Sequence, residues 1–122
     1  MPEIRGVGLD MCGIERMEKL MDNEAFLKRV FTPGELEYVQ NRGKMASASL
    51  AAIWAAKEAV FKAMGTGIFT SMQDVEIGHL ESGQPVCTLH GKALERAQGS
   101  MWISLTHENN MAAAVCVWTV PE

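Results

Sequence analysis

The chain has 122 residues, of which 48% are hydrophobic and 21% are charged, and its net charge is −4. This length and balance exclude a disordered chain, and we expect residues 1–122 to form a single domain around one core. The negative charge argues against nucleic-acid binding, and no apolar run is long enough to span a membrane. We expect a cytoplasmic protein, because the N-terminus shows no signal peptide and the three cysteines show no metal-binding spacing.

The first predicted element is a strand over residues 4–10, which ends at Asp10. Gly6 and Gly8 lie on one face of this strand. Glycine weakens a strand and often marks the close approach of another backbone or of a ligand. An Asp between a strand and a helix can cap the helix or bind a metal, and the local sequence leaves both roles open.

Three short helices are predicted next. Residues 14–21 carry apolar side chains at helical spacing, and Asn23 is a candidate cap for the second helix. The segment Thr-Pro-Gly-Glu at 32–35 is typical of a helix start, with a Thr cap, a Pro at the first position and a Glu that completes a capping box. We expect the third helix to end near Asn41.

The longest predicted helix covers residues 47–64 and ends at Gly65. After it, the pattern changes to short strands and one further helix. The strands cover 74–77, 86–89, 102–106 and 112–120, the helix covers 90–98, and a turn at 107–110 joins the last two strands. This order predicts an α+β fold, in which an antiparallel sheet packs against a long central helix accompanied by short helices.

The long helix is apolar except for a few charged residues, among them Lys57, Glu58 and Lys62. Glu58 and Lys62 are four residues apart and share a face that alanines border. An exposed salt bridge explains the pair but not its small neighbours. A Mg²⁺ site explains both, because Mg²⁺ binds one or two carboxylates and phosphate oxygens, which Lys62 would neutralise. Lys57 either extends to solvent along apolar surface or adds positive potential.

Three further features each allow a structural and a functional interpretation. Residues 65–67, Gly-Thr-Gly, are either a plain helix C-cap or a set of backbone N–H groups for a phosphate. His107 follows an apolar strand and is either structural or part of a site. The basic residues concentrated in residues 16–44 form either a solvated face or a landing site for an acidic partner.

Six segments together carry a family resemblance. They are GVGLDMCGIERM at 6–17, FTPGELEYV at 31–39, WAAKEAVFKAMGTGI at 54–68, DVEI at 74–77, GQPVCTLHGKA at 83–93 and ISLTHENNMAAAVCV at 103–117. In this order, and over nearly the whole chain, they resemble the holo-(acyl-carrier-protein) synthases, the small group of 4'-phosphopantetheinyl transferases. The combination of G-x-D, W-x-x-K-E-x-x-x-K and a late S-x-x-H is specific to that family.

The resemblance implies the phosphopantetheinyl transferase fold and a Mg²⁺-dependent enzyme. Such an enzyme moves 4'-phosphopantetheine from coenzyme A to a serine of an apo acyl carrier protein and releases 3',5'-ADP. It also implies a homotrimer with sites at subunit interfaces. Two alternatives remain: a transferase that acts on a carrier domain of a multienzyme fatty acid or polyketide synthase, and a non-catalytic module that binds a carrier or a nucleotide.

The resemblance also implies roles for individual residues. Asp10 and Glu58 resemble the metal carboxylates, and with Lys62 and His107 they make up the expected catalytic set. The expected coenzyme A site consists of Lys44, Lys62, Gly65, Thr66, Gly67, Thr106 and His107. The expected carrier surface consists of Arg16, Leu20, Arg29 and Trp54.

Three positions depart from the family pattern. Cys12 and Gly13 stand where relatives carry further acids, so we expect water rather than a third carboxylate to complete the metal shell. Ile53 stands where many small members carry an Arg, so one phosphate contact is missing or comes from elsewhere.

The last predicted strand is apolar at nearly every position from Ala112 to Trp118. A strand with one exposed face should alternate, so this pattern predicts cover on both faces. The cover is either the chain's own helices or another copy of the chain.

Overall fold

The computed structural model describes residues 2–121 and has the predicted α+β architecture. One antiparallel sheet has the order β1-β5-β4, and β2 and β3 form a second, two-stranded sheet. The strands are β1 (Glu3–Gly13), β2 (Val75–His79), β3 (Pro85–Leu89), β4 (Ser100–Glu108) and β5 (Met111–Val120). The helices are α1 (Ile14–Leu20), α2 (Glu24–Val30), α3 (Pro33–Gln40), α4 (Ala46–Met64) and α5 (Gly91–Arg96), with 3-10 turns η1 (Gly43–Met45) and η2 (Met72–Asp74).

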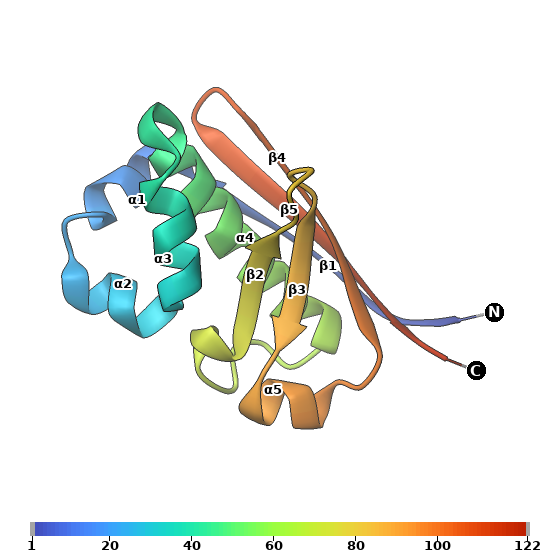
Figure 1. The fold of residues 1–122 in the computed structure, drawn as a ribbon. Coiled ribbons are helices and arrows are strands. Elements are labelled where there is room, and N and C mark those ends of the chain that lie inside the picture. The colour runs from blue at the N-terminus through green and yellow to red at the C-terminus, as the bar shows by residue number, and fades with distance from the viewer. Residues whose placement is uncertain (1, 122) are drawn as a thin grey trace.

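Helix α4 is the centre of the fold. It packs against the three-stranded sheet on one side and against the short helices α1 and α3 on the other (Figure 1). Thirteen of its 19 residues are buried. A helix that is apolar around most of its circumference is expected to be covered on most sides. No helix within residues 2–121 is long and apolar enough to cross a membrane.

The predicted helix signals are largely confirmed. The Asn23 side chain accepts a hydrogen bond from the Phe26 N–H, and Thr32 and Glu35 form the full capping box. Gly65 ends α4 in a left-handed conformation, with φ of 77°. Helix α5 is shorter than predicted and ends at Arg96 rather than at Gly99.

The hairpin between β4 and β5 is tighter than predicted. His107 was expected in the turn, but it lies within β4 and pairs with Ala112 of β5. Only Asn109 and Asn110 connect the strands, and Asn109 has a positive φ of 54°. Asn is among the residues that adopt this conformation most readily, which allows so short a connection.

The three-stranded sheet is covered by its own chain on one face only. On the face toward α4, β5 buries Ala112, Ala114, Cys116 and Trp118. On the other face, Val7, Leu9, Met11 and Trp102 are each about 60% exposed. The chain's own helices therefore cover one face of the last strand only, and a broad apolar surface is left on the other. Cover of that second face by another copy of the chain stays a prediction.

Candidate active site

The glycines of β1 allow that strand to lie directly on α4. A Cβ atom on Gly6 would lie 1.9 Å from the carbonyl oxygen of Ala63, and one on Gly8 would lie 1.8 Å from that of Ala59. No side chain fits these distances, so the predicted close approach is between strand and helix backbones. Asp10 is next on the same face of the strand, since side chains alternate, and it therefore points toward α4.

Asp10, Glu58 and Lys62 come together at this contact. The Lys62 Nζ donates to Asp10 Oδ1 at 3.0 Å and to the Leu9 carbonyl oxygen at 3.0 Å. The pKa of Glu58 is raised, first by burial and then by the neighbouring Asp10 carboxylate, while Lys62 and Arg16 oppose the shift. Two carboxylates close enough to disfavour each other's charge form a site that a cation would stabilise.

The donor set fits Mg²⁺ better than a softer metal. Asp10 and Glu58 offer oxygen ligands, and Mg²⁺ takes one or two carboxylates with the remaining positions left to water or phosphate. Within residues 2–121, no cluster of three or more His, Cys, Asp or Glu side chains could hold a metal ion. Asp10 and Glu58 are the two carboxylates of this cluster, and their role as metal ligands stays a prediction.

The expected carrier residues lie on neighbouring helices. Arg16 is in α1 and close enough to affect the pKa of Glu58. The Arg29 guanidinium of α2 lies 5.9 Å from the Phe26 ring centroid, and that ring lies 5.7 Å from the ring of Trp54 on α4. Both arginines are exposed, while Leu20 and Trp54 are half-buried.

The expected coenzyme A residues fall into separate places in one chain. Gly65, Thr66 and Gly67 follow the C-terminal end of α4 and are exposed, and Lys44 precedes its N-terminal end. With 1.5 Å per residue, the part of α4 that separates Lys44 from Lys62, from Ala46 to Lys62, is roughly 24 Å long. One chain does not bring these two lysines to the same phosphate group.

Thr106 and His107 of β4 are not among the hydrogen-bond partners of Lys62 within residues 2–121. They line a small groove of about 160 Å³ together with Ser49 and Ala52 of α4. Ser49 and Glu58 are nine residues apart, so they project from opposite sides of α4 at about 100° per residue. Strands β1 and β4, which carry Asp10 and His107, are at opposite edges of the sheet.

The same groove contains residues that the sequence did not single out. Tyr38 and His79 stack with ring centroids 3.8 Å apart, and the Arg42 guanidinium lies 5.5 Å from the Tyr38 ring centroid. Burial and then the Arg42 charge lower the pKa of His79. Tyr38 and Arg42 are only four residues apart, but His79 comes from β2 and joins them only in the folded chain.

Lys57 has neither of its predicted roles. It is completely buried, and its Nζ lies 2.7 Å from Glu35 Oε1. The Lys57 ammonium therefore neither reaches solvent nor faces a ligand. The sequence identifies Glu35 as a capping-box residue. Nothing in its local pattern indicates that its carboxylate also forms an ion pair with a lysine.

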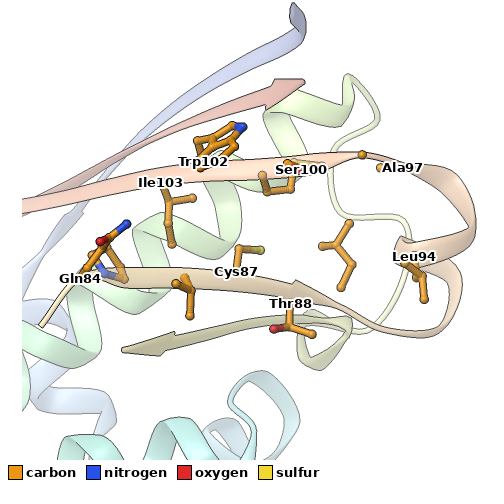
Figure 2. A pocket seen from close by; sticks show the side chains of 13 residues that line it. Gln84, Cys87, Thr88, Leu94, Ala97, Ser100, Trp102 and Ile103 are labelled. Atoms are coloured by element: carbon orange, nitrogen blue, oxygen red, sulfur yellow. The ribbon is translucent and has the colours of Figure 1, made fainter. Parts of the chain in front are cut away.

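A larger groove lies between β3 and β4, with a volume of about 470 Å³. Figure 2 shows Cys87 and Ile103 lining it from the two strands and Leu94 from α5. None of the predicted site residues lines it, so its size does not make it the active site.

Comparison with known proteins identifies the family. The model of the 4'-phosphopantetheinyl transferase superfamily matches residues 6–116. A holo-[acyl-carrier-protein] synthase of Treponema denticola is 40% identical over 119 residues, which cover 93% of this chain and 97% of the relative. The chain belongs to the holo-[acyl-carrier-protein] synthases of this superfamily. The resemblance inferred from the six sequence segments is thereby confirmed.

Solved structures of holo-[acyl-carrier-protein] synthases share the fold. The Neisseria meningitidis enzyme is 34% identical, with a TM-score of 0.83, over 95% of this chain and 98% of that one. The Helicobacter pylori enzyme, solved in complex with coenzyme A, is 30% identical with a TM-score of 0.80, over 92% of this chain and 98% of that one. The predicted α+β fold is therefore the fold of this family.

Proposed function

We propose that this chain transfers 4'-phosphopantetheine from coenzyme A to the serine of an apo acyl carrier protein, with Mg²⁺ bound by Asp10 and Glu58, and releases 3',5'-ADP. Family membership supports the reaction. The observation that carries the assignment of the site is the convergence of Asp10, Glu58 and Lys62 where β1 crosses α4.

The metal and Lys62 have complementary tasks. Mg²⁺ bound by the two carboxylates would neutralise diphosphate oxygens and polarise the phosphorus as a Lewis acid. Lys62 stabilises the charge of the leaving phosphate, because only two of its three N–H groups have partners within residues 2–121. The remaining N–H is available to a phosphate oxygen.

Glu58 is the candidate acceptor of the serine proton. Its carboxylate can accept this proton, and water is the alternative acceptor. Glu58 also lies near the exposed Arg16, the residue proposed to contact the carrier. The serine of a carrier bound there would approach the Glu58 carboxylate.

The carrier binds to the surface formed by α1, α2 and Trp54. The chain is acidic overall, with a net charge of −4, yet Arg16 and Arg29 are both exposed on these two helices. Leu20 and the half-buried ring of Trp54 add apolar contact area. Such a surface is complementary to an acidic helical partner.

The complete site requires more than one copy of the chain, which we propose to be a homotrimer. Lys62 and Asp10 lie at the β1 edge of the sheet, whereas Thr106 and His107 lie on β4 at the opposite edge, so a coenzyme A site that uses both groups draws them from two protomers. The exposed apolar face of the sheet supplies a surface for this association. In cross-strand register, Val7 aligns with Val117 and Trp102.

The transfer is tested by intact mass spectrometry of an apo acyl carrier protein after incubation with the enzyme, coenzyme A and Mg²⁺. We expect the mass of one phosphopantetheine group to be added, and none to be added with excess chelator. A carrier domain excised from a multienzyme synthase serves as the second substrate. The initial rates of transfer to the two substrates show which class of carrier the enzyme prefers. No mass gain on either carrier would favour a binding module instead.

The shared site is tested by Val7→Asp, which places a charge on the exposed apolar face of the sheet, opposite to the face that carries Asp10. We expect the variant to sediment near 13.4 kDa, the mass of one chain, and to lose transfer activity. A wild-type chain that sediments at this mass with full activity would refute both the trimer and the shared site.

A further inference from the structure

Two charged side chains are completely buried in the centre of the molecule. Lys57 and Glu35 each have a side-chain exposure of 0%, and their ion pair has an N–O distance of 2.7 Å. Burial lowers the pKa of Lys57 and raises that of Glu35, while their mutual attraction opposes both shifts. We assign a charged pair, because the surrounding hydrogen bonds all suit the ionised forms.

The hydrogen bonds of this pair connect five elements. The Lys57 Nζ also donates to the carbonyl oxygens of Val30 and Met72, at 2.9 Å each, so all three of its N–H groups have acceptors. The Glu35 carboxylate accepts from the backbone N–H groups of Thr32, at 2.9 Å, and Ile77, at 2.7 Å. The pair thus joins α2, α3, α4, η2 and β2.

Two of these connections lead to the proposed reaction. Val30, whose carbonyl oxygen Lys57 holds, directly follows Arg29 of the carrier surface. Lys57 itself directly precedes Glu58 of the metal site. The same two helices also meet through the Phe26 and Trp54 rings, which places an aromatic contact beside the ionic one.

Stability alone does not explain a buried ion pair. Apolar residues of similar volume often give a fold that is equally stable or more stable, whereas hydrogen bonds to fixed carbonyls define one geometry. The ammonium of Lys57 fixes the last turn of α2 and the start of η2 relative to one turn of α4. An apolar side chain would fill the same space without fixing these positions.

We propose that Lys57 and Glu35 are positioning residues that hold α2, with its carrier-binding Arg29, at a set distance from Glu58 on α4. This inference rests on the proposed function. The pair touches neither coenzyme A nor the carrier, and acts through Val30 and Glu58. Its loss therefore impairs the use of the carrier more than the use of coenzyme A.

The test is the double variant Glu35→Gln/Lys57→Met in the full chain. It removes both charges, fills the volume of both side chains, and keeps an amide oxygen for the Thr32 N–H, since Gln also completes a capping box. Glu37→Gln and Lys92→Met, at exposed positions on α3 and α5, are matched controls. Initial rates are measured well below each melting temperature, with coenzyme A and apo carrier varied separately.

We expect kcat/KM for the carrier to fall about 10- to 100-fold, the scale of a misplacement near 1 Å, with KM for coenzyme A unchanged. A merely structural role would lower the active fraction and leave both KM values as in the wild type. Wild-type kinetics in the folded double variant would overturn the proposal. If that variant does not fold, Glu35→Gln alone decides by the same two measurements.

The wild type separates this inference from the proposed function. If the wild type adds no phosphopantetheine to any carrier, the proposed function fails and the positioning role fails with it. If the wild type transfers the group and the variant does so equally well, the positioning role alone is refuted.

Discussion

Lys57 and Lys62 lie on the same helix and each pairs with one carboxylate, but their surroundings are opposite. Lys57 is fully buried, and every N–H of its ammonium group has an acceptor. The Lys62 side chain is 52% exposed and keeps one N–H without a partner within residues 2–121. A saturated, buried charge holds the fold together, whereas a partly paired charge at the surface can still bind a ligand.

The largest effect on activity is expected at the carboxylates beside Lys62. Asp10→Ala and Glu58→Ala should each lower kcat/KM by at least about 10³-fold, because losing a metal ligand costs several kcal/mol of transition-state stabilisation. The fold should remain, since removing either acid also removes the repulsion between the two carboxylates. Transfer rates at saturating Mg²⁺, together with thermal melting, measure the two effects.

Asp22→Ala, which removes an exposed carboxylate at the end of α1, is the matched control and should have wild-type kinetics. Near-wild-type turnover of either site variant at saturating Mg²⁺ would rule out the metal assignment. Loss of turnover together with a collapsed melting temperature would instead mean that the carboxylate supports the fold.

The two lysines should differ most clearly in stability. Lys57→Met leaves the Glu35 carboxylate buried without its partner, which should cost about 3–5 kcal/mol of unfolding free energy. Lys62→Met removes a pair whose lysine side chain is 52% exposed and whose aspartate side chain is 14% exposed, and it should cost about 1 kcal/mol. Urea denaturation of the two variants measures this difference directly.

The transfer rate of Lys62→Met is expected to fall although its stability is nearly unchanged. Lys62→Met should be stable and nearly inactive, because the leaving phosphate loses its cation. Equal stability of the two variants would show that burial and saturation do not distinguish the two pairs.

The sequence predicted those features that depend on neighbours along the chain. The Thr32 capping box, the Gly65 helix end and the shared face of Glu58 and Lys62 all follow from spacings of three or four residues. The two glycines of β1 also predicted a close approach, and the helix backbone proved to be what approaches. This contact brings Asp10 to Lys62.

What the sequence could not predict depends on distant segments that meet only after folding. Lys57 was predicted to reach solvent or to add positive potential, because no local pattern connects it with Glu35. The separation of Lys62 from His107 was equally hidden, since it follows from the order of β1, β5 and β4 in the sheet. The roles of the site residues remain predictions that only the kinetics above can test.

A smaller effect is expected at Arg16, an exposed cation near the metal site. Arg16→Glu should raise KM for the carrier by about tenfold, since reversing a charge that meets an acidic partner slows association. KM for coenzyme A should change less. The decrease of the rate with added salt should also become smaller, because salt screens less net attraction to the carrier.

Lys92→Glu makes the same charge change on α5, away from the proposed carrier surface, and should leave KM for the carrier unchanged. If KM for the carrier stays constant from low to high salt in the wild type, then Arg16 belongs to a solvated face only.

The smallest effect is expected at Glu76, which is intermediate between the two lysine pairs. Its carboxylate accepts from Thr32 Oγ1 at 2.7 Å and pairs with His90 Nε2 at 3.0 Å, with a side-chain exposure of 32%. The Thr32 hydrogen bond first, and then the one with His90, lower the pKa of Glu76 below 4.5. A carboxylate with a lowered folded pKa stabilises the fold above its unfolded pKa, and this contribution disappears as the pH falls through the folded value.

Glu76→Gln should therefore cost less than about 1 kcal/mol at pH 7, and its difference from the wild type should close below pH 4.5. Urea denaturation from pH 7 to 3, with Glu37→Gln as the control at an exposed position, measures this difference. A cost that persists undiminished at the lowest pH would mean that the Glu76 charge contributes nothing, and that the shape of the Thr32 hydrogen bond alone is what Gln disturbs.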